Sequence, residues 1–360
     1  MIKFLFMSSS SFLLYGANGY TGQLIAETAA LYGLTPVIAG RNEEMIRALA
    51  GRLGLSCRVF DLHQKEELAR ALEEVPLVLN CAGPFRETAR IMIEACLIAK
   101  KHYLDITGEV PVLEMVKQYQ ERAKEAGIMV MSGTGFDVVP TDCLALLLKN
   151  RLPDACALKL AFAPMGGGMS RGTAITTVAS LGEKGAVREN GRLVQKPLGH
   201  KGLWLELEGK RVFVMTIPWG DIATAWHTTG IPNIETYTAF KPAVYRLLKV
   251  QFLFNWLLRR TVVRTLIKKW IHKKITGPTP EVLRQSKVWV WGEVRNAEGK
   301  TLRAGLVTSN AYDLTAHSGL LIAKKVLEGN YQAGYQTPAG AYGEGLVLEI
   351  PGVTRIDEME

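Results

Sequence analysis

The sequence has few cysteines and histidines, and neither residue type forms a recognisable set of metal ligands. Its five cysteines lie far apart without a C-x-x-C pair, and its six histidines include no H-E-x-x-H pattern. These absences exclude the common zinc motifs and a disulfide framework. We therefore expect free thiols in a reducing, cytoplasmic compartment, and no bound metal.

Long apolar runs are also missing. The stretch Phe252–Leu258 is strongly apolar, but it is too short and too closely flanked by basic residues to span a bilayer. The apolar start Met1–Met7 is shorter than the hydrophobic region of a secretion signal, so we expect no cleaved leader. Internal repeats are absent as well, and 360 residues are enough for two ordinary domains.

Residues 241–275 lack acidic side chains altogether. They include ten Lys and Arg, which exceeds the net charge of +9, so the rest of the chain is near neutral and the basic pI does not indicate a nucleic-acid partner. Basic residues alternate with Leu, Phe, Trp and Val at helical spacing, as in helices that lie on anionic membranes. The pattern equally fits contact with an acidic carrier protein, an entrance for a lipid-like substrate, or helices packed on a second domain with their charges in water.

What the sequence does contain, near its start, is a strand, a glycine-rich turn and a helix. An apolar run ends in Gly16, Gly19 and Gly22, spaced G-x-x-G-x-x-G, and an amphipathic helical pattern follows. Gly16 can form the tight turn, Gly19 can let a pyrophosphate approach the backbone, and Gly22 can let the helix pack closely. Phosphates would then meet the N–H groups of the helix N-terminus. The other residues assigned to this phosphate turn are Asn18, Tyr20 and Thr21. The alternative is an ordinary strand-to-helix turn.

The next strand, residues 35–40, indicates which dinucleotide binds. NAD-binding folds place Asp or Glu after this strand to bond the ribose 2′-hydroxyl. Arg41 stands there instead, and the first carboxylate is Glu43. A guanidinium can pair with a 2′-phosphate, so we predict NADP(H) as the cofactor. The alternative is that Arg41 only begins a helix on a solvated face.

Apolar runs and helical patterns then alternate up to about residue 145, which predicts a Rossmann-type, doubly wound parallel sheet. The pattern changes near residue 155. The runs 288–294 and 302–307 flank a turn and read as a hairpin, so we expect a second, mixed α+β domain. A helix is expected over 311–328, and another near Gly172–Gly182. The tail from Tyr335 to Ile350 is expected to be irregular.

Several motifs resemble the saccharopine dehydrogenase-like oxidoreductases, especially the branch with trans-acting enoyl reductases. The matching segments are residues 15–22, 39–41, 80–85, 103–109, 135–142 and 336–339. The resemblance implies a Rossmann domain over 1–145, a substrate or interaction domain over 146–310 that contains the basic segment 241–275, and a return of 311–360 to the first domain. It does not identify the substrate.

The strand ends supply the remaining candidates. Around the cofactor we place Asp61, after the third strand, and the turn after the fourth strand, which consists of Cys81, Ala82, Gly83, Pro84 and Phe85. Phe85 could wall the nicotinamide, or the turn could only begin a helix. Cys81 fits a small buried residue better than a reactive thiol.

Asp105 and Asp137 are the candidates for proton transfer. Asp105 has apolar neighbours, which would raise its pKa, but a structural hydrogen-bond anchor is the alternative. Substrate candidates are Thr107, Glu109, Thr141 and Asp142, of which Thr141 or Asp142 could instead cap a helix. Two Y-x-x-x-K matches, at Tyr237 and Tyr245, lie outside the Rossmann pattern, and we interpret them as coincidence.

These features together predict an NADP(H)-dependent reductase of a small-molecule or lipid-linked substrate, transferring hydride to C=O, C=N or activated C=C. The alternative is a non-catalytic NADP(H) sensor or a membrane-associated scaffold. The sequence leaves the oligomeric state open, a homodimer included, and also any peripheral membrane association.

Overall fold

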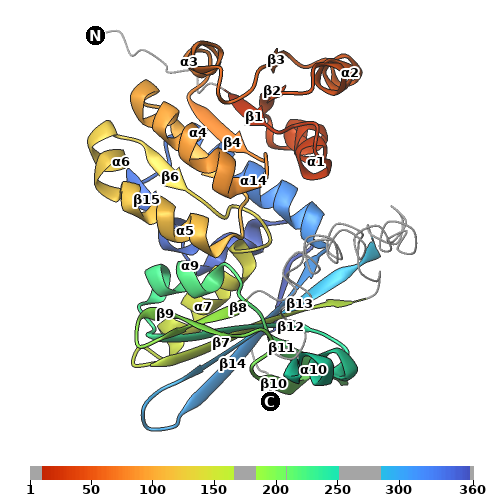
Figure 1. Ribbon diagram of the computed structural model, residues 1–360, viewed down its shortest axis with the longest axis vertical. Coiled ribbons are helices and arrows are strands. Elements are labelled where there is room, and N and C mark those ends of the chain that lie inside the picture. The colour runs from red at the N-terminus through yellow and green to blue at the C-terminus, as the bar shows by residue number, and fades with distance from the viewer. Residues whose placement is uncertain (1–9, 166–183, 208, 251–284, 357–360) are drawn as a thin grey trace. The chain divides into compact units, whose positions relative to one another are not determined.

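The computed structural model describes residues 10–165, 184–207, 209–250 and 285–356 (Figure 1). The chain divides into two compact units. The first comprises Met1–Cys143 and Ala311–Pro351, and the second comprises Leu144–Asn310 and Gly352–Glu360. The predicted helix near Gly172–Gly182 and most of the basic segment, from residue 251 onward, lie outside the described residues.

The first unit is built on a seven-stranded parallel sheet with the order β15-β6-β5-β4-β1-β2-β3. Its strands are β1 (Ser11–Tyr15), β2 (Thr35–Gly40), β3 (Cys57–Val59), β4 (Leu77–Asn80), β5 (His102–Asp105), β6 (Met129–Met131) and β15 (Gly334–Gln336). The chain order reverses between β1 and β4, which is where open α/β sheets bind ligands. The predicted Rossmann-type sheet is confirmed.

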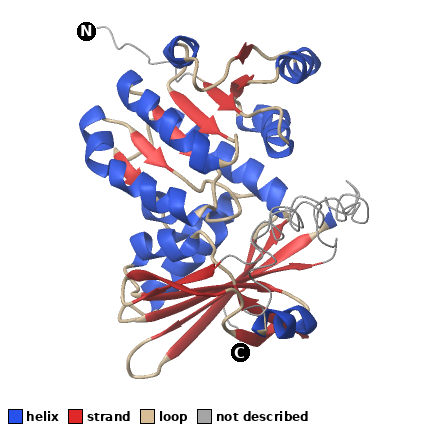
Figure 2. Ribbon diagram, viewed as in Figure 1, coloured by secondary structure: helices blue, strands red, loops and turns tan. Residues whose placement is uncertain are grey.

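Helices cover both faces of this sheet (Figure 2). The helices of the first unit are α1 (Tyr20–Thr28), η1 (Ala29–Tyr32), α2 (Glu43–Leu53), α3 (Lys65–Glu73), α4 (Phe85–Ala99), α5 (Val110–Val116), η2 (Lys117–Tyr119), α6 (Gln120–Ala126), α14 (Ala311–Leu327), α15 (Pro338–Tyr342) and η4 (Glu344–Glu349). Helix α7 (Val139–Arg151) begins in this unit and ends in the second. All four residues of β4 are buried, as expected for a parallel strand covered on both sides. Leu13, Val78, Tyr103 and Val130 of the sheet share one core cluster with α3, α4 and α6.

The C-terminal part of the chain completes the first unit. Helix α14 packs beside α1, and β15 adds a seventh strand parallel to β6. The expectation of an irregular tail was therefore wrong at Gly334–Gln336. A strand of three residues is too short to show a period-2 pattern in the sequence.

The second unit contains a nine-stranded mixed sheet. Its main order is β10-β11-β12-β7-β13-β14-β16, and β8 and β9 form a hairpin beside β12. The elements are β7 (Ala157–Met165), β8 (Lys184–Glu189), β9 (Arg192–Pro197), β10 (Gly202–Leu207), β11 (Lys210–Thr216), α9 (Asp221–Thr229), β12 (Asn233–Ala239), α10 (Pro242–Lys249), β13 (Lys287–Arg295), β14 (Thr301–Ser309) and β16 (Thr354–Ile356). The predicted second mixed domain is confirmed. The end of the tail differs from expectation, because β16 pairs with β14 of this unit.

A row of alternating charges fixes the register of the central strands of this sheet. Glu235 of β12 lies opposite Lys159 of β7, which lies opposite Glu293 of β13, which lies opposite Arg303 of β14. Glu293 accepts hydrogen bonds from Lys159 at 2.7 Å and Arg303 at 2.9 Å. A slip by one residue would place apolar side chains or glycine opposite these charged groups.

None of the described helices is long and apolar enough to cross a membrane.

Candidate functional site

The turn after β1 has the geometry expected of a phosphate-binding turn. Gly16 adopts φ +85°, and a β-carbon there would lie 2.6 Å from the backbone nitrogen of Ala82. The Gly16 and Ala17 amides both donate to the Ala39 carbonyl, at 2.8 and 3.1 Å. Only glycine satisfies this combination of backbone conformation and crowding, so Gly16 holds β1, β2 and β4 together at the switch point.

The other two glycines have different surroundings. A β-carbon at Gly22 would lie 2.5 Å from the Gly16 carbonyl oxygen, so close packing requires this glycine. Gly19 has only that same oxygen nearby, at 3.4 Å, which leaves its outer side open. Gly19 is the N-cap of α1 and provides no side-chain cap, and the first turn of α1 contains no acidic residue. The amides of this turn therefore face a space where an anion would be stabilised.

The remaining residues of the turn support its shape. The Asn18 carbonyl accepts a hydrogen bond from the Gln23 side chain at 3.0 Å. Tyr20 is 59% exposed, and its ring meets that of Tyr312 edge-on, with centroids 4.8 Å apart. Thr21 is half-buried in the first turn of α1. Tyr312 is a neighbour of the turn that sequence reasoning missed, because it lies almost three hundred residues away along the chain.

Arg41 follows β2 directly and is exposed. Within the described chain, it forms no ion pair or hydrogen bond with a carboxylate. Three other arginines of this region are each paired: Arg47 with Glu43, Arg52 with Glu27, and Arg58 with Glu74. An exposed guanidinium without a partner, at the strand end nearest the ribose, has the chemistry required to hold a 2′-phosphate.

Tyr15 and Asp61 lie beside Arg41. Burial and the Asp61 carboxylate together raise the pKa of Tyr15 to about 12, and Arg41 opposes this shift. Both charged groups therefore lie within electrostatic reach of the Tyr15 hydroxyl. Asp61 accepts a hydrogen bond from the His63 amide at 3.0 Å, and its carbonyl accepts one from Gln64. Asp61 thus shapes the turn before α3 with one carboxylate oxygen and with its backbone carbonyl oxygen.

The turn after β4 is held by side chains of its own segment. Asn80 accepts a hydrogen bond from the Ala82 amide at 3.0 Å, and Thr88 donates to the Ala82 carbonyl at 2.7 Å. Burial raises the pKa of the Cys81 thiol above its ordinary value, which favours an inert small residue over a nucleophile. Gly83 and Pro84 are exposed.

Phe85 begins α4 and packs partly against the core cluster of the first unit. Its amide donates to one oxygen of Glu109 at 2.8 Å, and the Arg86 amide donates to the other at 3.3 Å. The Glu109 carboxylate therefore caps α4. Both its oxygens are engaged by the helix N-terminus, which indicates a structural role, and the assignment of Glu109 to the substrate stays a prediction.

Asp105 is fully buried and accepts four hydrogen bonds. The donors are the Thr107 amide at 2.9 Å, the Gly133 amide at 3.1 Å, the Tyr103 hydroxyl at 2.8 Å and the Ser132 hydroxyl at 2.7 Å. Burial raises the pKa of Asp105, and these bonds oppose the increase. The geometry favours the structural alternative, in which Asp105 joins β5 to the loop after β6.

Three other substrate candidates are also engaged within the protein. Thr107 is buried and accepts the Glu109 amide at 3.0 Å. Thr141 donates to the Val138 carbonyl at 3.0 Å, and Asp142 accepts the Ala339 amide at 2.9 Å. Thr141 and Asp142 are buried, and these bonds secure α7 and α15, which favours the capping alternative; their assignment to the substrate stays a prediction.

Asp137 differs from these carboxylates. It lies in the loop after β6, it is half-buried, and no described residue donates a hydrogen bond to its side chain. Burial raises the pKa of Asp137 to about 7. A carboxyl group with this pKa exchanges its proton readily at neutral pH, which is what a general acid or base requires.

Two features hold Asp137 in place, and sequence reasoning missed both. Gly108 lies against it, because a β-carbon at Gly108 would be 2.8 Å from the β-carbon of Asp137. Helix α14 fixes the loop: Thr315 accepts the Phe136 amide at 3.0 Å, and Ser318 donates to the Thr134 carbonyl at 2.7 Å. A glycine directly after a strand end was the available signal for the first feature.

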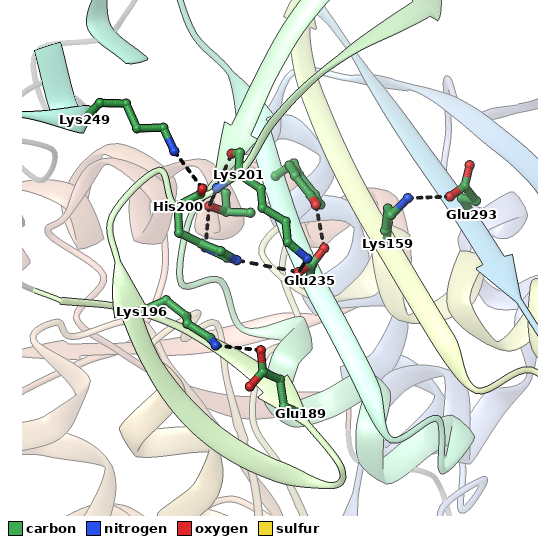
Figure 3. Close-up of polar contacts among 10 residues, drawn as sticks. Lys159, Glu189, Lys196, His200, Lys201, Glu235, Lys249 and Glu293 are labelled. Atoms are coloured by element: carbon green, nitrogen blue, oxygen red, sulfur yellow. Dashed lines mark hydrogen bonds and ion pairs between the residues drawn. The ribbon is translucent and has the colours of Figure 1, made fainter. Parts of the chain in front are cut away.

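The Y-x-x-x-K match at Tyr237 lies in the second unit, within a separate polar cluster (Figure 3). His200 and Lys201 converge on Glu235, and the Tyr237 hydroxyl donates to Glu235 at 2.6 Å. Burial and this bond raise the pKa of Tyr237, whereas a proton-relay tyrosine needs a lowered one. Lys241 is exposed. The cluster is interpreted as structural. Among the described residues, no group of His, Cys, Asp and Glu is arranged to hold a metal ion.

Comparison with known proteins finds a domain match within the first unit. Residues 12–131 match the model of the saccharopine dehydrogenase NADP binding domain. A saccharopine dehydrogenase-like oxidoreductase of Rattus norvegicus is 27% identical over 202 residues, which cover 49% of this chain and 47% of that protein. A trans-acting enoyl reductase of Mycobacterium bovis is 30% identical over 147 residues, covering 39% and 35%. The matched part of the chain thus spans about half the length of the rat relative.

A solved structure agrees over the whole chain. Apo saccharopine dehydrogenase (L-Glu forming) from Saccharomyces cerevisiae superposes with a TM-score of 0.68 and covers 96% of this chain and 99% of that one, at 12% identity. Identity this low shows the fold alone. The family resemblance and NADP(H) as the cofactor are confirmed by the domain match.

Proposed function

Because residues 12–131 form a saccharopine dehydrogenase NADP-binding domain, we propose that the whole protein is an NADP(H)-dependent reductase with Asp137 as its proton donor. The bond reduced is a C=O, a C=N or an activated C=C of a small or lipid-linked substrate. One observation carries the proposal: a cofactor cradle and an unpartnered carboxyl of neutral pKa lie at the same edge of one sheet.

The residues of the cradle fit NADP(H). Gly16, Gly19 and the first turn of α1 would hold the diphosphate, and Arg41 would hold the 2′-phosphate. Bound NADPH supplies the hydride. Reduction of a polarised double bond also needs a proton at the other atom, and the protein has to donate or relay that proton.

The sheet order supports Asp137 in this role. Arg41 follows β2 and the glycine turn follows β1, whereas the loop with Asp137 follows β6, on the other side of the switch point. Three strand spacings separate β1 from β6, or about 14 Å. The phosphate-binding groups and the Asp137 carboxyl thus lie on opposite sides of the switch point. An extended dinucleotide requires this separation, because its phosphates and its nicotinamide lie at different ends.

Asp137 holds its proton on a side chain that water reaches. Its loop is fixed by α14, so the carboxyl does not need to be ordered when a substrate binds. After donation, the raised pKa favours return of a proton from solvent.

The name of the mycobacterial relative supports enoyl reduction as one form of the activity. The rival function is a non-catalytic NADP(H) sensor, for which the lack of a clear catalytic acid in the sequence would be an argument. The neutral pKa of Asp137 removes that reason.

The test is NADPH consumption with a panel of neutral aldehydes, ketones, cyclic imines and enoyl thioesters. Asp137→Asn is expected to lower kcat by about 10²–10⁴-fold and to leave the Kd for NADPH unchanged. The reductive rate of the wild type should fall as pH rises above about 7, since the donor must be protonated. The matched control is Asp154→Asn, whose carboxylate accepts Asn296 at 2.7 Å in the second unit.

Full activity of Asp137→Asn would refute the role of this carboxyl. Tight NADPH binding without turnover on any member of the panel would favour the sensor.

A further inference from the structure

The second unit carries an apolar and basic patch around α10. Of the five large apolar side chains exposed in the described part of this unit, four gather here: Trp204 at 48%, Val244 at 38%, Leu247 at 64% and Val250 at 41%. Single exposed apolar residues are common on protein surfaces, but a cluster of this kind marks an interaction site.

Aromatic contacts join α10 to the hairpin of β10 and β11. The Trp204 ring meets Phe213 with centroids 5.2 Å apart, and Phe213 meets Tyr245 of α10 at 5.1 Å. Leu248 is the buried residue of the helix. Trp204 and α10 therefore belong to one surface, and α10 lies beside β10 and β11 in Figure 1.

The inward side of α10 explains what its outer side presents. Tyr245 and Leu248, three residues apart, face the hairpin, so Val244 and Leu247 project beside them toward solvent. Both are exposed even though they are apolar. The helix thus keeps an apolar stripe that the described part of its domain leaves exposed.

Basic groups border this stripe. The exposed cations of α10 and its N-cap are Lys241, Arg246 and Lys249. The Arg211 guanidinium lies 4.9 Å from the Trp204 ring centroid, and the Lys249 ammonium lies 4.7 Å from that of Tyr245. Glu206 is the one carboxylate on the described strands of the hairpin, and it lies 3.7 Å from Arg211. Residues 241–275 contain no acidic residue.

We propose that this patch, formed by Trp204, Arg211 and the residues of α10 with Val250, docks the protein on an anionic lipid surface. Half-exposed Trp beside cations suits the interface between headgroups and acyl chains, and the excess positive charge fits anionic headgroups. The inference is independent of the reductase activity.

The experiment is flotation of the full-length protein with phosphatidylcholine vesicles that contain or lack phosphatidylserine. The wild type is expected to float with the anionic vesicles and to stay behind with the neutral ones. The double variant Trp204→Ser/Leu247→Ser should lower the partition coefficient at least about tenfold. Lys241→Gln/Arg246→Gln should lower it by about fivefold for each charge removed, and added salt should have the same effect.

Matched controls separate this patch from general surface properties. Leu31→Ser/Ile98→Ser removes apolar side chains of the first unit that are 78% and 83% exposed, and it should float like the wild type. Lys65→Gln/Lys300→Gln removes two exposed cations elsewhere and should also leave flotation unchanged. Circular dichroism and thermal unfolding of every variant report that both units are folded.

Three results would overturn the proposal. They are a wild type that does not float with anionic vesicles, patch variants that float as well as the wild type, and retention on immobilised polyglutamate without flotation. The last would assign the patch to an acidic protein partner.

Discussion

Replacing Asp137 by asparagine should stabilise the protein at alkaline pH, although most substitutions of partly buried polar residues destabilise. The reason is that the native structure partly shields this carboxyl from water and gives it no hydrogen-bond donor among the described residues. Ionisation is therefore unfavourable in the native state and costs nothing comparable in the unfolded chain.

The sign and the pH window follow from the pKa. Burial raises the pKa of Asp137 from 3.8 to about 7. As pH rises through this interval, the unfolded chain loses the proton first, so the native state binds more protons and its stability falls. The group's contribution is fully present below pH 3.8 and is lost once pH exceeds about 7.

The magnitude is bounded by the size of this change. A rise in pKa from 3.8 to about 7 corresponds to at most ~4 kcal/mol, at about 1.36 kcal/mol per pKa unit. Water reaches this half-buried side chain, so we expect about 2 kcal/mol. The asparagine side chain would keep the shape of the aspartate and remain neutral at all pH values.

The assay is urea unfolding of both proteins at pH 5 and pH 8, followed by a probe of the first unit. The variant should gain about 2 kcal/mol over the wild type at pH 8 and much less at pH 5. Asp61→Asn is the control, because its carboxylate accepts the His63 amide, and it should gain nothing at either pH. A variant that is equally or less stable at pH 8 would show that the carboxylate is solvated or partnered, and would refute the reasoning.

Three further substitutions test the surrounding structure by unfolding and NADPH titration. Gly16→Ala forces a side chain into φ +85° against the Ala82 backbone, so it should cost about 3 kcal/mol of stability and weaken NADPH binding. Its control, Gly33→Ala, has φ +69° with open space and should cost about 1 kcal/mol and leave NADPH affinity unchanged. Equal effects of the two substitutions would contradict a cofactor site at the glycine turn. Asp105→Asn turns an amide toward hydroxyl and amide donors and should cost about 3 kcal/mol at any pH, so a neutral result would contradict its anchoring role. Glu109→Gln should weaken the cap of α4 and cost about 1 kcal/mol of stability, with turnover nearly unchanged. A loss of turnover at constant stability would instead support contact of Glu109 with the substrate.

The cofactor half of the site could be predicted from the sequence because its signals are local. Gly16, Gly19 and Gly22 sit within seven consecutive residues. A backbone conformation or a close contact requires Gly16 and Gly22, and Gly19 leaves the outer side of the turn open. Arg41 could be identified because, in this fold, the residue after the second strand contacts the 2′ position of the ribose. Alternation of apolar and helical patterns was enough to predict the parallel sheet except its edge strand β15.

The roles of the carboxylates could not be predicted, because they depend on partners far away in the sequence. Asp105 meets Ser132, Glu109 meets Phe85, and Asp142 meets Ala339. An acidic residue after a strand reads the same in the sequence whether it caps a helix or faces a substrate. Asp137 became distinct only when the structure showed which carboxylates were already engaged.

The central claim is that Arg41 recognises the 2′-phosphate of NADP(H). Its most direct test is calorimetric titration of NADPH and NADH into the wild type, Arg41→Ala and the control Arg47→Ala, whose guanidinium is paired with Glu43. We predict that the wild type prefers NADPH, that Arg41→Ala loses about 10–100-fold in NADPH affinity with NADH binding unchanged, and that Arg47→Ala behaves like the wild type. Equal binding of the two nucleotides by the wild type, or an undiminished preference in Arg41→Ala, would contradict the claim.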